Sequence, residues 1–573
     1  MRCQMQNNKK IDSAPPCFLF KYSHLVIYLL ISEIHFAQAG AIATDSGTLL
    51  KQTQPALPVA PSNIETGLKD KTTHDSADNT SFFVSSINIS GNTLFDTQTL
   101  HALVKVSEGS NMTLNQIQTL CDIITQHYRQ HGYMLSRAVI PQQEINNGEL
   151  NILVVEARLG EIQVENTSRV NNTLIDATLS HLQRGSIIEQ ASFDRALLLL
   201  SDIPGVNTSA TFTPGKAVGT SNLVVNTEGE PFFSGVATVD DFGNKYTNRL
   251  RTGVTASLVN PLRQGDDLSF NLITTGQSMQ YGRVDYSLLI NGYGTRVGGA
   301  YLALHYELGG DIANLKAHGD AQAGSLWIMH PLLRSITANV YGNIQYDYTQ
   351  INDHIDIISL QNDRHVNALN FTFTGDRRDA FLGGGVNSWN ASFILGRVDF
   401  DNDAAEAADR TTANTQGAFS KWNLSANRLQ RINDRTNLWA TINMQIANDN
   451  LDTSQKVVVG GPSSVRAYDT GTIAGDNIYQ STVELRRDLG SYYGQLQAVV
   501  FADYAHVKMN QHLWASATGK NTSNLAGIGV GVNWSSKKDW HVKSYAATSV
   551  GPSSSQVDSS DKTIVWLEVS KGF

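Results

Sequence analysis

Residues 437–446 read NLWATINMQI, and apolar side chains alternate along this stretch with polar ones, apart from the aromatic Trp439. Such alternation is typical of a β-strand that has one face in an apolar and one in a polar environment. The apolar face holds Leu438, Ala440, Ile442, Met444 and Ile446. The polar face holds Asn437, Trp439, Thr441, Asn443 and Gln445. A soluble sandwich would bury one face of each sheet in a dry core, so inward Asn, Gln and Thr side chains favour a water-filled lumen.

From about residue 232 to the end, sixteen alternating segments follow one another. Each has roughly the 9 to 11 residues that a tilted membrane strand needs. Short connections alternate with long ones, and the long ones are residues 309–319, 350–363, 401–416, 448–477 and 508–522. Bacterial outer-membrane barrels have short periplasmic turns, long outer loops and an even number of strands. The sequence therefore predicts a 16-stranded antiparallel transmembrane β-barrel over residues 229–573.

The composition of the 573 residues is that of a folded protein, with 41% hydrophobic and 17% charged residues. A net charge of -9 gives no basic surface for nucleic acid, which is excluded as a partner. Residues 1–39 resemble a secretory signal peptide, because lysines precede the apolar run 25–31 and a small-residue site ends at Ala39. No later run of about 18 apolar residues predicts a spanning helix.

Two small modules lie between the leader and the barrel. Residues 40–80 are rich in Pro and polar residues and form an N-terminal segment and linker. A short helix is compatible with residues 48–54, and the sequence leaves open whether it plugs the pore. The first module covers 81–158, with a strand at 83–89, helices at 97–104 and 115–128, and strands at 134–140 and 150–155. The second covers 159–228 and repeats this order, which predicts two α+β domains.

Several motifs in these regions resemble those of one transporter family. In the first module they are Gly132, Tyr133, Arg137, Pro141, Gly148 and Glu156, and in the second Pro204 and Gly205. The barrel contributes Asn260, Pro261, Leu262, Gly265 and Asp266, then Val465, Arg466, Ala467 and Tyr468, and finally Phe501, Asp503 and Ala505. The chain resembles the outer-membrane transporters of two-partner secretion, the hemolysin secretion/activation family. The resemblance implies that the two modules are periplasmic POTRA domains.

The residues also place a charged pair in the lumen. The alternation Leu496, Ala498, Val500, Ala502, Tyr504 makes one face apolar, so Phe501 and Asp503 face inward. Arg466, in the loop after the eleventh strand, is a candidate partner, since a guanidinium holds a carboxylate with two parallel bonds. Such a pair would pin a gate loop inside the pore and, in a partly wet lumen, contribute ~1 kcal/mol. Without that partner, Arg466 would be an ordinary charged residue of an outer loop.

Two alanines depart from the family pattern. Ala467 and Ala505 stand where the resemblance expects glycine. If the glycine at the loop tip takes a positive φ, Ala467 is strained or the tip is arranged differently.

The resemblance further implies the activity and the partners. The protein would export an unfolded, hemolysin- or adhesin-like β-helical exoprotein, whose N-terminal secretion domain binds the first POTRA domain by β-augmentation. Outer-membrane lipid and the barrel-assembly machinery are the other expected partners, and the terminal Phe573 is the expected insertion signal. The alternative is an outer-membrane protein assembly insertase of the same superfamily, although more modules would be expected. A passive porin would lack such modules.

Catalytic and metal sites are not predicted. His127 and His131 are four residues apart, but no Glu or Cys completes a zinc site. No phosphate-binding loop and no nucleophile elbow occurs. Asp376 and Asp379 flank two arginines and are interpreted as a solvated turn. We expect no enzymatic activity and no cofactor.

Overall fold

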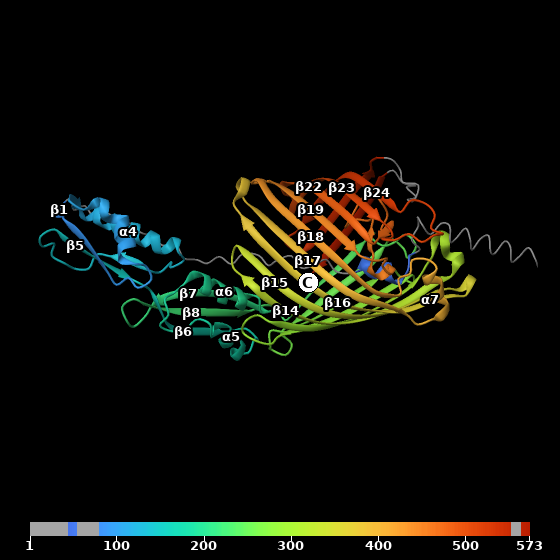
Figure 1. The fold of residues 1–573 in the computed structure, drawn as a ribbon, viewed down its shortest axis with the longest axis horizontal. Coiled ribbons are helices and arrows are strands. Elements are labelled where there is room, and N and C mark those ends of the chain that lie inside the picture. Colours follow the sequence, from blue (N-terminus) through green and yellow to red (C-terminus); the bar gives the residue numbers. More distant parts are fainter. Residues whose placement is uncertain (1–43, 54–79, 552–562) are drawn as a thin grey trace, which may run out of the picture.

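The computed structural model describes residues 44–53, 80–551 and 563–573. The predicted leader and most of the predicted linker lie outside these ranges. Two α+β modules stand in line at one end of a long barrel, and the chain terminates in the barrel wall (Figure 1). Among the described residues, no helix is both long and apolar enough to cross a membrane.

The first module packs two helices on a three-stranded sheet. Its elements are β1 (Ser81–Val84), β2 (Ser86–Ser90), α3 (Thr97–Val104), η1 (Lys105–Ser107), β3 (Ser110–Thr113), α4 (Leu114–Gln130), β4 (Arg137–Val139) and β5 (Glu149–Val155). The sheet order is β2-β5-β4, and β1 pairs with β3 in a separate ribbon. The predicted strand 83–89 is therefore two strands, and the predicted strand 134–140 shrinks to three residues.

The sequence of helix α4 explains where the helix begins and which of its faces is buried. Thr113 and Gln116 form a reciprocal capping box at its start, which satisfies two backbone N–H groups. Ile117, Ile124 and Tyr128 recur at helical spacing and are buried against the sheet. Cys121, between them, is 5% exposed and acts as a small core residue.

The second module repeats the design and has its own core. Its elements are β6 (Arg158–Asn166), α5 (Asn172–Leu179), α6 (Gln190–Ser201), β7 (Val206–Pro214) and β8 (Thr220–Gly229), with sheet order β6-β8-β7. The Asn171 side chain accepts a hydrogen bond from the Thr173 N–H and caps α5. Phe193, Leu197 and Leu200 turn one face of α6 into the core.

The barrel closes with the sixteen strands that the sequence predicts. They are β9 (Phe233–Asp240), β10 (Arg251–Val259), β11 (Asp267–Thr274), β12 (Met279–Leu289), β13 (Arg296–Glu307), β14 (Ala317–Arg334), β15 (Ala338–Ile355), β16 (Leu360–Asp379), β17 (Gly385–Phe400), β18 (Gly417–Asn433), β19 (Thr436–Ala447), β22 (Asn477–Ser491), β23 (Gln495–Lys508), β24 (Thr522–Ser535), β25 (Trp540–Ser549) and β26 (Thr563–Gly572). In β19, Ile442 is 53% exposed on the outside and Gln445 only 1% exposed inside. The alternation of residues 437–446 thus separates lipid from lumen.

Several strands are longer than the sequence predicts. β14, β15 and β16 have 18, 18 and 20 residues, so most of the expected long loop at 350–363 is paired strand. Outside the membrane a strand pair keeps its backbone hydrogen bonds, and polar cross-strand contacts such as His305 to Asp320 at 2.8 Å replace lipid contacts. Periodicity alone therefore does not mark where the membrane ends. Short helices η2 (Gly310–Leu315), η3 (Asp356–Ile358), η4 (Phe381–Gly383) and α7 (Asp403–Arg410) connect some of these strands.

The strands β9 and β26 close the barrel. Five residue pairs join them, from Glu568 with Asp240 to Gly572 with Val236. Phe573 continues this seam, since its N–H and C=O exchange hydrogen bonds of 2.9 Å with Gly235. Its ring packs 5.7 Å from that of Phe233, and 55% of the residue remains exposed.

Candidate functional site: the occupied lumen

Two segments occupy the inside of the barrel. The first is the inner helix α2 (Ser46–Thr53), blue in Figure 1 and enclosed by barrel strands. Its Leu49 and Leu50 are buried in one cluster with Leu302, Leu304 and Tyr306 of β13. The sequence was compatible with a short helix here but left open whether it lies in the pore. The apolar residues on the lumen side of β13 could have indicated that it does.

The second segment is the inner loop, residues 448–476, which connects β19 to β22. It contains η5 (Thr453–Gln455) and a small hairpin of β20 (Val457–Val459) and β21 (Ile473–Gly475). Val465 is fully buried with Val507 of β23 and Leu525 of β24. Apolar packing against the barrel wall therefore holds the loop within the barrel.

Arg466 and Asp503 lie together at the tip of this loop. Arg466 Nε and Nη2 donate hydrogen bonds of 2.9 and 2.8 Å to the two oxygens of Asp503. The backbone N–H of Arg466 donates a third bond to the same carboxylate, at 3.1 Å. Asp503 also accepts a hydrogen bond of 2.9 Å from the Thr482 hydroxyl. This carboxylate is thus satisfied by four donors and sets the position of the loop tip.

Sequence reasoning missed a second carboxylate at this site. Arg466 Nη1 donates a 2.6 Å hydrogen bond to Glu484 of β22, whose other oxygen bonds Arg486 at 2.7 Å. The signal was present, because Thr482, Glu484 and Arg486 lie on the inward face of one alternating strand.

Aromatic rings enclose the same guanidinium. The Arg466 guanidinium carbon lies 3.4 Å from the centre of the Phe501 ring and 5.2 Å from that of Tyr545. Trp566 of β26 is fully buried, and its indole N–H donates a 2.7 Å bond to the Arg466 carbonyl. Trp566 and Tyr545 were not predicted, although alternation with the outward Val565 and Leu567 turns Trp566 inward.

The burial of this pair corrects an expectation. The lumen was expected to be partly wet there, yet the side chains of Arg466 and Asp503 are 4% and 0% exposed. Water therefore screens them little, and removing one partner leaves an uncompensated buried charge, which typically costs about 3 to 5 kcal/mol. The pair constrains the loop more strongly than a surface ion pair would.

The structure also shows how the two unexpected alanines fit. Ala467 does not take a positive φ, so the anticipated backbone strain is absent at this position. Its methyl group is instead directed at Gly527 of β24, where a Cβ would lie 2.6 Å from the Ala467 Cβ. Ala505 is fully buried in the cluster of Val465, Val507 and Leu525. Glycine on the facing strand thus makes room for alanine at the loop tip.

In the first module, three of the predicted motif residues come together. Gly132, at φ 89°, ends the turn after α4, and the Tyr133 N–H donates to the Tyr128 carbonyl at 3.0 Å. The Tyr128 hydroxyl donates a 2.9 Å bond to Glu156, which is 7% exposed. The motif therefore joins the end of α4 to the end of the sheet.

Glu156 also fixes the loop before α3. It accepts hydrogen bonds from the N–H groups of Thr93 and Leu94, at 2.7 and 2.9 Å, and from the Thr93 hydroxyl. Burial raises the pKa of this carboxyl, but the bonds from Thr93, Leu94 and Tyr128 outweigh burial and hold the pKa below its usual range. Glu156 is thus an ionised structural group.

The other motif residues of this module lie apart from that cluster. Gly148 takes φ 75°, and its carbonyl accepts a 2.7 Å bond from the Ser85 N–H at the junction of β1 and β2. Arg137 is exposed in β4, and Pro141 follows that strand. The structure brings neither of them to Glu156.

The motifs of the second module and of the first barrel turn meet each other. The Asn260 side-chain amide donates a hydrogen bond to the Pro204 carbonyl, and a Cβ at Gly205 would lie 2.7 Å from Val259. Nearby, Arg334 at the end of β14 holds both oxygens of Asp202 at 2.7 Å. These contacts dock the second module on the barrel.

Comparison with known proteins finds a domain family and a relative that this chain resembles. The profile of the ShlB-type POTRA domain matches residues 82–157. The heme/hemopexin transporter protein HuxB of Haemophilus influenzae (strain 86-028NP) is 27% identical over 484 residues, which cover 83% of this chain and 84% of HuxB.

Two solved structures share the fold. CdiB from Escherichia coli superposes with a TM-score of 0.69 at 21% identity, covering 98% of this chain and 100% of that one. BamA from Haemophilus ducreyi, lacking POTRA domains 1–3, gives 0.51 at 13% identity and covers 86% of this chain and 100% of that one.

The profile described as haemolysin secretion/activation protein ShlB/FhaC/HecB matches residues 219–534, which include most of the barrel and the whole inner loop. This match spans more than half of the chain. The protein therefore belongs to the haemolysin secretion/activation family of ShlB, FhaC and HecB.

Proposed function

We propose that the protein secretes one large exoprotein, hemolysin- or adhesin-like, through its barrel to the cell surface. The observation that carries this proposal is the way the lumen is closed. Side-chain packing and ionic contacts hold the inner loop and the inner helix, and neither segment is a strand of the wall. Both segments can therefore move while the barrel keeps its strand pairing.

The lining of the lumen suits an unfolded chain. A cavity of about 500 Å³ lies beside the inner helix, and polar side chains dominate one side of it: Ser325, Asn343, Gln345, Asp347, Asn370 and Asn390. Such a surface gives hydrogen bonds to any main chain and selects little among side chains. Passage then needs no nucleophile and no nucleotide.

The POTRA domains are the proposed docking site for the N-terminal secretion domain of a β-helical exoprotein. In the described part of the chain, β4 and β7 each have a strand neighbour on one side only, so each can accept an added strand. β7 is the longer edge, with nine residues, whereas the Ala138 N–H of β4 already bonds Thr125 at 3.0 Å. We propose that the first domain receives the substrate and that β7 extends the same track toward the barrel.

A comparison of secreted proteins tests this function. Cells that lack the gene should lose one large protein from the medium, and the intact gene should restore it. A chain lacking residues 82–158 should insert normally, as judged by heat-modifiable mobility, yet fail to restore export. Normal export by that truncated chain would contradict the docking proposal.

An assembly insertase is the second candidate function, because BamA shares the fold. In that case loss of the gene would lower many outer-membrane proteins and would not remove one secreted protein. We propose further that Phe573, exposed at the seam, is the signal through which the barrel-assembly machinery inserts this chain. Truncation of Phe573 should reduce the amount of folded barrel, and an unchanged amount would remove that role.

A further inference from the structure

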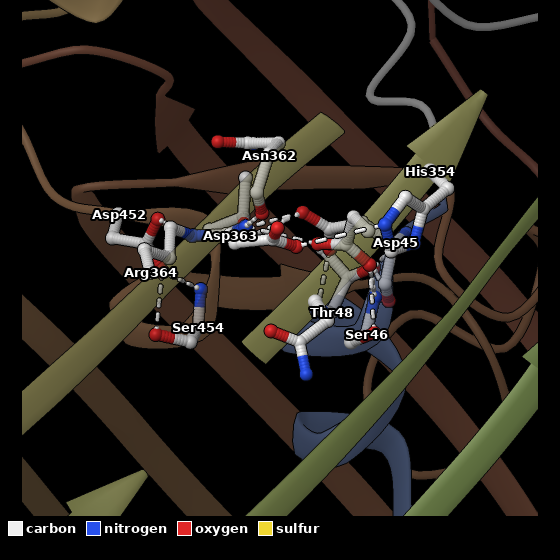
Figure 2. A network of polar contacts seen from close by, with 12 residues as sticks. Asp45, Ser46, Thr48, His354, Asn362, Asp363, Arg364, Asp452 and Ser454 are labelled. Carbon is white, nitrogen blue, oxygen red and sulfur yellow. Dashed lines mark hydrogen bonds and ion pairs between the residues drawn. The ribbon is translucent and has the colours of Figure 1, made fainter. Parts of the chain in front are cut away.

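Arg364, near the start of β16, reaches three carboxylates from three different segments. Its side chain is 1% exposed; Nε bonds Asp452 of the inner loop at 2.6 Å, and Nη1 bonds Asp353 of β15 at 2.9 Å. Nη2 lies 3.4 Å from Asp45, directly before the inner helix. Figure 2 shows Asp452 on one side of this cluster and Asp45 on the other. One guanidinium thus touches the wall, the loop and the helix.

Further hydrogen bonds tie the same segments to each other. The Ser46 N–H and hydroxyl both donate to Asp353, at 3.0 and 2.7 Å. The Thr453 hydroxyl of the inner loop donates to Asp45 and accepts a 3.0 Å bond from Arg364 Nη2. Helix and loop therefore share donors and acceptors as well as the central cation.

The helix backbone also lies directly against the loop. A Cβ at Gly47 would be 2.5 Å from the Ser454 nitrogen and 2.8 Å from its Cα. Only glycine permits this approach, so the contact depends on the sequence of the helix.

The charges of the cluster make its parts interdependent. One cation faces three carboxylates, and Arg364 and Asp452 are at most 6% exposed. Ion pairs in such a site are strong because water is excluded. Withdrawal of the helix would expose Arg364 and its bond to the loop, and withdrawal of the loop would expose the contacts of the helix.

We infer that Arg364 is a positioning residue that couples the inner helix to the inner loop, so that displacement of either segment loosens the other. The inference rests on the proposed secretion pore only in that both segments must move to clear the lumen. Its test needs no exoprotein, so it can fail while the proposed secretion stands.

The experiment follows the helix and the loop separately in intact outer membranes. Thr53→Cys, in a background without the three native cysteines, places a thiol on the buried side of the helix, and its labelling rate by a maleimide reports helix release. Trypsin cleavage at Lys456, which is 7% exposed, reports loop release. Arg364→Ala should accelerate both the labelling and the cleavage by about tenfold, a factor that is typical of the coupling between two sites.

Variants on each side of the cluster keep the inference testable even if Arg364→Ala does not insert. Asp452→Asn changes only the loop and should accelerate labelling of the helix, while Gly47→Leu changes only the helix and should accelerate cleavage of the loop. Arg283→Ala, which removes a lumen guanidinium paired with Asp285, should change neither signal. The inference is overturned if Asp452→Asn affects only the loop and Gly47→Leu only the helix, or if Arg364→Ala releases one segment alone.

Discussion

Arg466 is held by contacts of three kinds, which come from three strands of the barrel. Asp503 on β23 and Glu484 on β22 bind its charge, Phe501 covers its face, and Trp566 on β26 binds its carbonyl. A loop residue that is bonded to three strands has one preferred position. We therefore expect its removal to change the loop before it changes the barrel.

Arg466→Ala should reduce secretion strongly while the amount of inserted barrel stays near normal. The reason is that Asp503 would be left buried without its cation, while Glu484 would keep only Arg486, a loss of about 3 to 5 kcal/mol that the loop can relieve by moving out. Secretion and heat-modifiable mobility measured on the same cells check this. Arg486→Ala is the matched control, because it removes a more exposed guanidinium from the other oxygen of Glu484. Normal secretion by the Arg466→Ala variant would remove Arg466 from the mechanism.

The fit of Ala467 to Gly527 predicts a reciprocal rescue. Gly527→Ala should loosen the inner loop, because the added methyl group would meet the Ala467 Cβ at 2.6 Å. Ala467→Gly should restore the loop in that background and change little by itself. Protease protection of residues 448–476 in the four combinations gives the coupling, and additive effects would show that the two residues do not interact.

Glu156 predicts a pH dependence in the first POTRA domain. Its pKa in the folded domain lies below the usual 4.5, so its stabilisation is present above about that pH and is lost as pH falls through the folded pKa. Glu156→Gln should lower stability at pH 7 by about 1.5 to 3 kcal/mol and flatten the loss on acidification. Hydrogen exchange of residues 82–157 in the whole protein measures both, and an acid profile equal to that of the native chain would contradict this role.

At the scale of elements, the features that the sequence predicted are those that determine the alternation of side chains in strands and their spacing in helices. Strand number, the inward face of Asp503 and the helix 97–104 follow from local periodicity. Glu484 and Trp566 were within reach of the same reasoning. The cluster around Arg364 was not, because Asp45 is 319 positions away and Asp452 is 88 positions away. No local pattern brings such residues together.

The junction between α6 and β14 carries its own prediction. Asp202→Ala would leave Arg334, whose side chain is 5% exposed, without its bidentate partner and should loosen the second POTRA domain from the barrel. Hydrogen exchange of α6 should rise and secretion should fall. Lys216→Ala breaks a pair with Glu161 in the same module at 3.5 Å, but Lys216 is 88% exposed, so little should change. Equal effects of the two variants would exclude a special role for the junction.

At the scale of the whole molecule, the protein is an outer-membrane transporter with its POTRA domains in the periplasm. Its contacts fall into two groups that lie in different parts of this architecture. The second POTRA domain meets the first barrel turn through Pro204 and Asn260, while the inner loop and helix meet at Arg364. Docking and closure are thus built from separate contacts.

The unequal length of the barrel strands has a consequence for the intact cell. A strand of 20 residues rises about 66 Å along its own axis, and even when tilted it exceeds the apolar band of about 25 Å. The hairpin of β15 and β16, whose tip at residues 356–359 points away from the POTRA domains in Figure 1, therefore stands above the membrane as a stiff ridge. This ridge is an accessible epitope, and antibodies against it should stain unbroken bacteria.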